Sequence, residues 1–344
     1  MVKGSKVLVT GGSGFLGQHI IKHLQLYFDD IVEIRVLDLI AYQQRLDFDT
    51  KVEVKSYKGS ITDLDFVCKA CHKVDAVIHA ASLIDSRFLP NTEALKEINI
   101  KETVIKACLQ ENVKYLLYCG SISAVQGYEE VENGNESTLP IPSRRLMIRD
   151  YGETKYYAQT LVKNADGKAT KDGTILHTVT LLPLTMFGEL DTNLITKALG
   201  TAKSNHGVLQ RVGNGKALAQ FVYVGNVAFA FVCALKSLIS GSDIGGQFFF
   251  ISDDTHPQNT AEFLLPYLKL HHYNVSKISI PAYFVFLYIL SPVKRVSMSV
   301  SLSAVIFLNR TFFINYDKAR TLLSYFPIYT PAESEQMSSR YYAT

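Results

Sequence analysis

Three polar side chains in the middle of the chain have the types and spacing needed to remove a proton from an alcohol. Tyr151 and Lys155 are separated by one helical turn, so in a helix they lie on one face. A free tyrosine has a pKa of about 10, too high for an efficient base at neutral pH. A neighbouring ammonium is expected to lower that pKa, because it stabilises the phenolate. Ser121 can donate a hydrogen bond to the reacting oxygen, so the set predicts general-base catalysis at a hydroxyl group.

The predicted elements around these residues would bring them together. Ser121 follows an apolar run at 115–119 that is typical of a strand, although Ser123 is a competing candidate for the same role. Tyr151 and Lys155 open a predicted helix over 150–164. A Tyr-x-x-x-Lys pair is weak by itself in a chain with 19 tyrosines. Its position after a strand that ends in serine therefore carries the prediction.

A glycine-rich turn near the N-terminus predicts a dinucleotide-binding unit. The string Thr10-Gly-Gly-Ser-Gly-Phe-Leu-Gly17 follows the apolar run 6–9 and opens a predicted helix over 15–27. Glycines there allow a tight turn, a close approach to a pyrophosphate and close packing of helix on strand. The helix would direct its free N–H groups at the phosphates. The expected cofactor contacts in this unit are Gly11, Gly14, Phe15, Leu16 and Gly17.

Asp38 favours NAD as the cofactor. It ends a second predicted strand, 33–38, at the expected distance after the glycines, where a carboxylate can bind the ribose hydroxyls and repel a 2′-phosphate. Arg35 and Arg45 leave NADP open, because an arginine can accept that phosphate.

Further cofactor contacts are expected at the ends of later strands. Ala80 and Ala81 follow a predicted strand at 74–79, and small residues there let the backbone pass close to the cofactor. Pro183 follows the strand 175–182 and would flank the nicotinamide. Tyr151 and Lys155 complete the expected cofactor contacts, since the lysine would hold the nicotinamide ribose. Asn99, on a predicted helix at 91–111, is expected to brace the backbone of the active site.

Alternating strands and helices in the first half predict an α/β fold with a Rossmann-type, doubly wound parallel sheet. We expect a NAD-binding domain over 1–182 that includes the catalytic residues. A smaller substrate-binding lobe is expected over 183–344, because the alternation loosens after Pro183. The short polar C-terminus, 333–344, is expected to be partly disordered.

Composition excludes several classes of function. The net charge is +3, from 35 basic and 32 acidic residues with no long run of either sign, which argues against a nucleic-acid surface. The five cysteines include one Cys-x-x-Cys, at Cys68 and Cys71, without the second pair that a zinc site needs. We therefore expect no metal and assign these thiols to core packing.

One segment departs from soluble composition. Residues 278–308 contain two apolar stretches separated by Val293-Lys294-Arg295. The first stretch is bracketed by prolines and is shorter than the roughly 20 residues that span a bilayer. We therefore interpret the segment as an interfacial membrane anchor, with a single membrane span and a buried helix pair as the alternatives.

The chain resembles the extended short-chain dehydrogenases, and within them the 3β-hydroxysteroid dehydrogenase/Δ5-4 isomerase family. The resemblance runs over nearly the whole chain. Its general motifs are the glycine turn 10–17, Val77-Ile-His-Ala-Ala81, and Ser121 with Tyr151 and Lys155. The strings more specific to the family are Val222-Tyr-Val-Gly-Asn-Val-Ala228 and Gly246-Gln-Phe-Phe-Phe-Ile-Ser-Asp-Asp-Thr255.

The resemblance implies oxidation by NAD of the 3β-hydroxyl of a steroid or sterol in steroid biosynthesis. Tyr151, Lys155 and Ser121 would have the roles given above. In two-step members of the family, the 3-keto product then isomerises from Δ5 to Δ4. The resemblance further implies an endoplasmic reticulum membrane with the active site facing the cytosol, or a mitochondrial membrane. A homodimer is one expectation for the assembly.

Three alternative functions stay open. The strings Gly14-Phe-Leu-Gly-Gln-His19 and Val212-Gly-Asn-Gly-Lys216 are similar to the sterol-4α-carboxylate 3-dehydrogenases, whose 3-ketone product allows loss of the 4-carboxylate. Nucleotide-sugar epimerases and dehydratases share the glycine turn and the Tyr/Lys pair. A catalytically silent NAD-binding module is the third alternative, and the complete catalytic set counts against it.

Overall fold

A seven-stranded parallel sheet forms the centre of the molecule. The computed structural model describes residues 4–84, 91–100, 102–139, 146–281 and 302–343. The strand order is β11-β7-β5-β4-β1-β2-β3, and every neighbouring pair is parallel. The strands are β1 (Ser5–Thr10), β2 (Ile31–Asp38), β3 (Val54–Lys58), β4 (Ala76–His79), β5 (Tyr115–Cys119), β7 (His177–Pro183) and β11 (Gln247–Ile251). The predicted Rossmann-type α/β fold is confirmed.

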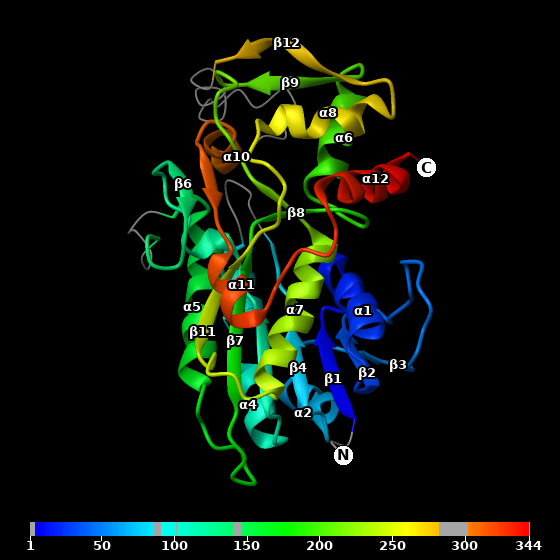
Figure 1. Cartoon of the computed structure of the whole chain (residues 1–344), viewed down its shortest axis with the longest axis vertical. Coiled ribbons are helices and arrows are strands. Elements are labelled where there is room, and N and C mark those ends of the chain that lie inside the picture. The colour runs from blue at the N-terminus through cyan, green and yellow to red at the C-terminus, as the bar shows by residue number, and fades with distance from the viewer. Residues whose placement is uncertain (1–3, 85–90, 101, 140–145, 282–301, 344) are drawn as a thin grey trace.

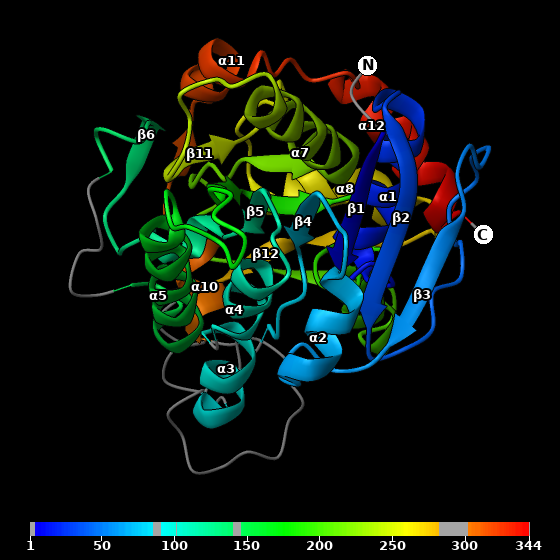
Figure 2. The ribbon, with the colours of Figure 1, turned by 90° about the horizontal axis from the view of Figure 1, so that it is seen from below.

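Helices cover both faces of the sheet, which explains why the central strands β1, β4 and β5 are buried along almost their whole length. One face packs against α1 (Phe15–Tyr27) and α7 (Val224–Ile239), and the other against α2 (Leu64–Cys71), α4 (Thr103–Gln110) and α5 (Arg149–Ala165) (Figure 2). Alternate residues of one strand enter different cores. Val7 and Val9 belong to the cluster under α1 and α7, whereas Leu8 belongs to the cluster under α2 and α4.

The second half of the chain contributes both to the sheet and to a separate lobe. β11 and α7 return to the sheet, and α11 (Asp317–Leu323) packs on both. The lobe lies beyond the carboxyl ends of the strands (Figure 1). Its elements are α6 (Ile195–Ser204), β9 (Val208–Val212), α8 (Thr260–Lys269), β12 (Asn274–Ile280) and α10 (Leu302–Phe307).

Short elements connect the sheet with the lobe. The remaining elements are a 3-10 helix (Ile122–Ala124), α3 (Thr92–Asn99), β6 (Val131–Gly134), β8 (Thr185–Phe187), β10 (Phe221–Tyr223), β13 (Phe312–Ile314) and α12 (Pro331–Tyr342). Among the short strands, β8 pairs with β10 and β6 pairs with β13, both in parallel.

Most of the predicted membrane-associating segment 278–308 lies outside the described residues, which omit 282–301. At the start of this segment, in β12, the side chain of Ile278 is 78% exposed. In the described ranges, we find no helix with the length and apolar character required to cross a bilayer.

The expectation of a partly disordered C-terminus is wrong. Residues 331–342 form α12, which begins with a capping box between Thr330 and Glu333 and has proline in its first turn. The helix is also anchored by its last residue, because the Tyr342 hydroxyl donates to the carbonyls of Gly188 and Asp191, each at 3.1 Å. The polar composition of 333–344 did not indicate an ordered helix, because α12 buries only a few side chains.

Candidate active site

Tyr151 and Lys155 lie together at the carboxyl edge of the sheet, as their spacing predicts. Both are in the first turns of α5 and are almost fully buried, with 8% of Tyr151 and 2% of Lys155 exposed. The Lys155 ammonium lies 5.9 Å from the centroid of the Tyr151 ring. It donates a hydrogen bond to the carbonyl of Cys119, the last residue of β5, at 2.9 Å. This bond fixes the start of α5 against the end of the strand.

Lys155 alone does not lower the pKa of Tyr151, and the predicted joint effect of the ammonium and a positively charged nicotinamide stays a prediction. Burial raises the pKa of the Tyr151 phenol above its ordinary value, and the neighbouring Cys119 thiol adds to the rise. Burial also lowers the pKa of Lys155 to about 8. The physical reason is desolvation, which disfavours the charged form of both groups and exceeds the attraction between them. The protein's own groups therefore hold the phenol neutral.

Ser121 is one of two serines beside the Tyr151 hydroxyl. Side-chain hydrogen bonds from Ser121 and Ser82 favour the phenolate, against the effect of burial. Ser121 is the N-cap of the 3-10 helix, where its hydroxyl oxygen accepts from the backbone N–H of Ser123 at 3.2 Å. The structure thus brings Ser121 to the tyrosine, and Ser123 contributes a backbone donor. The catalytic roles of these residues stay predictions.

Asn99 braces the site, as predicted. Its side-chain oxygen accepts from the backbone N–H of Leu83 at 2.9 Å and from the Ser82 hydroxyl at 3.1 Å. Its amide donates to the Leu83 carbonyl at 2.9 Å and to the Thr154 hydroxyl at 3.2 Å. Thr154 in turn donates to the carbonyl of Tyr151 at 2.8 Å. This network joins the segment after β4 to α5 through the buried amide of Asn99.

Sequence reasoning missed Ser82 and Thr154. Ser82 follows Ala80 and Ala81, which were assigned to the cofactor, so its position at the end of β4 could have identified it. Thr154 lies inside the Tyr-x-x-x-Lys string, but no spacing rule shows that its side chain faces Asn99.

The glycine turn has the shape that a dinucleotide requires. Gly11 has a φ of +72°, and a Cβ there would come within 2.7 Å of the backbone nitrogen of Ala81. A Cβ on Gly17 would come within 2.1 Å of the Gly11 carbonyl oxygen. These two contacts explain the glycines at the start and end of the turn. Gly14, between them, is exposed and its missing Cβ leaves an open approach to the backbone.

The start of α1 is suited to phosphate groups. Phe15, Leu16 and Gly17 form its first turn, where no side chain caps the N–H groups and no acidic residue is present. Together with the open backbone at Gly14, this arrangement fits an anion at the N-terminus of the helix.

Asp38 is held next to this turn. Its carboxylate accepts from the backbone N–H of Ser13 at 3.0 Å and, more weakly, from that of Ile40 at 3.4 Å, and each carboxylate oxygen keeps a second acceptor position for the ribose hydroxyls. Arg35 cannot serve a 2′-phosphate here, because its buried guanidinium donates to Glu33 and to the carbonyls of Ala70 and His72. One of the two arguments for NADP is therefore removed.

The remaining predicted contacts lie along the same edge. The backbone N–H of Ala80 donates to the Thr10 carbonyl at 3.2 Å, and that of Ala81 donates to the Thr10 hydroxyl at 3.3 Å. Pro183 ends β7, which lies beside β5, and it pairs with Ile251. The sheet order thus places the glycine turn, the alanines and Pro183 in sequence along one edge, and α5 brings Tyr151 to the same edge.

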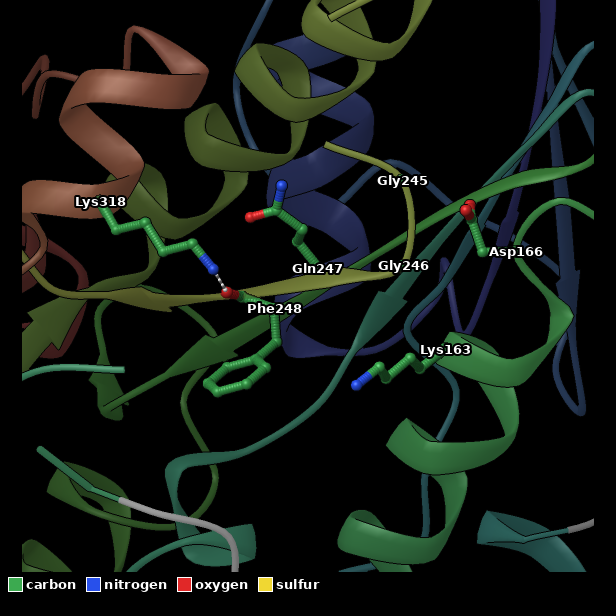
Figure 3. Close-up of a pocket in the computed structure, with 7 residues that line it drawn as sticks. All are labelled: Lys163, Asp166, Gly245, Gly246, Gln247, Phe248 and Lys318. Atoms are coloured by element: carbon green, nitrogen blue, oxygen red, sulfur yellow. Dashed lines mark hydrogen bonds between the residues drawn. The ribbon is translucent and has the colours of Figure 1, made fainter. Parts of the chain in front are cut away.

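A separate hollow of about 470 Å³ lies at the opposite end of the sheet (Figure 3). It surrounds the start of β11, where Lys318 donates to the Phe248 carbonyl at 2.8 Å and Lys163 extends from the last turns of α5. Because it lies at the amino ends of the strands, it is not part of the predicted site.

Solved structures with this fold include several nucleotide-sugar enzymes. UDP-glucose 4-epimerase from Thermus thermophilus, in complex with NAD, matches with a TM-score of 0.69 and 20% identity, covering 98% of each chain. The dTDP-glucose 4,6-dehydratase DesIV from Streptomyces venezuelae, with NAD bound, has a TM-score of 0.71 and 18% identity, covering 98% of this chain and 96% of that one. An epimerase from Methanothermobacter thermautotrophicus has a TM-score of 0.73 and 18% identity, covering 99% and 92% respectively. At these identities the likeness shows the extended Rossmann-type fold.

The sequence itself gives the narrower assignment. The pattern that defines the 3-beta hydroxysteroid dehydrogenase/isomerase family matches residues 8–282, from β1 to the end of β12. The matched range contains the glycine turn, Asp38, Ser121, Tyr151 and Lys155, which the structure places along one edge of the sheet. The chain belongs to the 3-beta hydroxysteroid dehydrogenase/isomerase family.

Proposed function

We propose that the protein uses NAD to oxidise the 3β-hydroxyl of a steroid or sterol to the 3-ketone. The observation that carries the proposal is the buried Tyr151–Lys155 pair, with Ser121 beside the phenol, at the same sheet edge as the glycine turn and Asp38. Membership of the family supports the substrate class. The NAD held by the similar solved structures supports the cofactor.

Each residue has a task in this reaction. The first turn of α1 binds the pyrophosphate, and the Asp38 carboxylate accepts from the ribose hydroxyls. Ser121 donates to the substrate oxygen and orients it toward Tyr151. Once ionised by release of its own proton to solvent, Tyr151 would remove the hydroxyl proton, while Lys155 would hold the nicotinamide ribose and keep a positive charge near the phenol. Bound, oxidised NAD would supply the hydride acceptor and a second positive charge that favours this ionisation.

Isomerisation of the 3-keto product from Δ5 to Δ4 is the second part of the proposal. A carbonyl at C3 acidifies the hydrogens at C4, and transfer of one proton from C4 to C6 conjugates the double bond with the ketone. The family includes isomerases by description, which supports this step.

The test uses membranes that carry the full chain, incubated with NAD and separate candidate substrates, with products identified by mass spectrometry. A 3β-hydroxy-5-ene steroid such as pregnenolone should yield the conjugated 4-ene-3-one. Release of carbon dioxide from a 4-carboxysterol would favour the decarboxylating alternative, and conversion of UDP-glucose would favour a nucleotide-sugar enzyme. Tyr151→Phe is the matched control, and absence of NADH formation with every 3β-hydroxy sterol would refute the proposal.

We also propose association with the endoplasmic reticulum membrane, with the active site toward the cytosol. The support is the apolar composition of 278–308 and the exposed side chain of Ile278, its first residue. Sedimentation of the protein with membranes, and its retention after washing at high salt, is the expected result. Recovery in the supernatant without detergent would contradict it.

A further inference from the structure

The aromatic ring nearest to the Lys155 ammonium in this site is that of Tyr118. The ammonium lies 4.9 Å from the centroid of Tyr118, compared with 5.9 Å for Tyr151. Both distances are within the roughly 6 Å over which a ring face attracts a cation. Tyr118 is the second-last residue of β5 and is only 2% exposed. Burial strengthens such an attraction, because water does not compete for the charge.

Tyr118 is held in place by neighbours in the sheet. Thr10, His79 and Tyr118 are register partners at the ends of β1, β4 and β5. The rings of His79 and Tyr118 lie 5.5 Å apart at a tilt of 40°. His79 is itself fixed by a 2.7 Å hydrogen bond between its Nδ1 and the Thr10 hydroxyl. Thr10, at the start of the glycine turn, therefore fixes His79, and His79 supports one side of the Tyr118 ring.

Within the described ranges, the hydroxyl group of Tyr118 makes no contact that would explain why this side chain is buried here. It is buried and finds no hydrogen-bond partner among the residues that the structure describes. A buried hydroxyl without a partner costs free energy, so the contacts that retain this side chain are those of its ring. The ring packs against Ala158 and Val162 of α5, the helix that carries Lys155.

We propose that Tyr118 is a positioning residue whose ring holds the Lys155 ammonium beside Tyr151. The inference rests on the proposed function only in that it assigns Lys155 to the catalytic set. Without the ring, the lysine side chain would keep its hydrogen bond to the Cys119 carbonyl but lose the attraction that opposes its desolvation.

The Cys119 carbonyl and side chain partly oppose the desolvation of the ammonium, but the three described side chains around it carry no negative charge at neutral pH. From β4, His79 carries no charge at neutral pH, because burial lowers its pKa to about 3. From β5, the Cys119 thiol is kept neutral by burial, which raises its pKa. On the same helix, the pKa of Tyr151 is raised and the phenol stays neutral. Removal of the Tyr118 ring should therefore lower the pKa of Lys155 further.

The test measures the titration of Lys155 directly by NMR, with carbon-13 at the lysine Cε of the full-length protein. The Lys155 signal is assigned by its loss in Lys155→Arg. Three variants are compared with the parent: Tyr118→Phe, Tyr118→Leu and Leu116→Ala. Leu116 is the matched control, because it is fully buried two residues earlier on the same strand and makes a cavity away from the lysine.

Tyr118→Leu should lower the Lys155 midpoint by about 1 pH unit, a tenfold change in its acid dissociation constant. Tyr118→Phe and Leu116→Ala should leave it unchanged. An unchanged midpoint in Tyr118→Leu would overturn the proposal, and a fall in Tyr118→Phe equal to that in Tyr118→Leu would assign the effect to the hydroxyl instead. Where sterol oxidation is found, its high-pH limb should move in parallel.

The titration needs no substrate, so failure of the sterol assay and failure of this inference are distinguishable. A lowered midpoint in Tyr118→Leu together with no oxidation of any sterol would refute only the proposed function. Sterol oxidation with identical high-pH limbs in Tyr118→Leu and the parent would refute only the role of Tyr118.

Discussion

Replacement of Asp38 by asparagine separates two tasks of one carboxylate. In the structure, Asp38 accepts from the backbone N–H of Ser13 at 3.0 Å, which fixes its side chain beside the glycine turn. Asparagine has a similar shape and keeps an oxygen for the Ser13 N–H. The substitution therefore preserves the local fold, while it removes the negative charge and one acceptor for the adenosine ribose.

The expected loss of NAD affinity follows from the hydrogen bonds involved. A hydrogen bond to a charged group contributes about 1.5–3 kcal/mol, so the loss of one such bond should weaken NAD binding about 10- to 150-fold. NADP should respond in the opposite direction. A carboxylate about 4 Å from a phosphate charge is repelled by about 1 kcal/mol in water and by about 4 kcal/mol near a protein surface, and the amide removes this repulsion.

The assay is a titration of the full-length protein with NADH and NADPH, followed by fluorescence, at one ionic strength. Asp65→Asn is the control, because Asp65 is exposed in the first turn of α2 and its replacement makes the same change in net charge. We expect the preference for NADH over NADPH to fall at least tenfold in Asp38→Asn and to stay constant in the control. An unchanged preference in Asp38→Asn would refute the assignment of Asp38 to the ribose.

Three further predictions concern catalysis and stability. Tyr151→Phe should reduce turnover by about 10²- to 10⁴-fold with an unchanged Kd for NAD, and near-normal steroid oxidation would exclude this tyrosine as the base. Tyr342→Phe loses two hydrogen bonds to the loop between β8 and α6, and should lower the free energy of unfolding in urea by about 1–2 kcal/mol. His19, His23 and His79 have pKa values lowered by burial to about 3. Below their ordinary pKa of about 6.5 the unfolded chain takes up protons that the folded protein cannot, so stability should fall as the pH decreases, by about 4 kcal/mol at about pH 5.5 for the three together. A Tm that does not fall between neutral pH and about pH 5.5 would contradict the assignment of the three histidines as buried and neutral.

The fold near the cofactor could be predicted because local signals and sheet position agree there. The glycine turn at 11–17 requires a strand before it and a helix after it, and the structure has β1 and α1 at these places. The edge strand β11 was not predicted. Its sequence, Gln247-Phe-Phe-Phe-Ile251, is a short apolar run that fits a strand or a buried helix equally, and nothing local indicates that it pairs with β7.

The membership of the candidate site was easier to predict than its electrostatics. Parallel strands share one carboxyl edge, so Ser121 after β5 could be grouped with Tyr151 in the first turn of α5 and with Asn99 at the end of α3. Tyr118 was not predicted to belong to the candidate site, because it lies inside an apolar strand, where a tyrosine is typical of core packing. Its contact with Lys155 depends on how closely α5 approaches β5, which no spacing in the sequence records.

The pKa of Tyr151 shows why a catalytic motif does not by itself make a base. One helical turn places an ammonium near the phenol, and in water that proximity would favour the phenolate. In this fold both side chains are buried, which raises the pKa of the phenol and lowers that of the lysine to about 8. The Lys155 ammonium donates to the Cys119 carbonyl and lies closer to the Tyr118 ring than to the ring of Tyr151. The proposed removal of a proton by Tyr151 therefore requires further positive charge at the site, which an oxidised dinucleotide bound at the neighbouring glycine turn and Asp38 would supply.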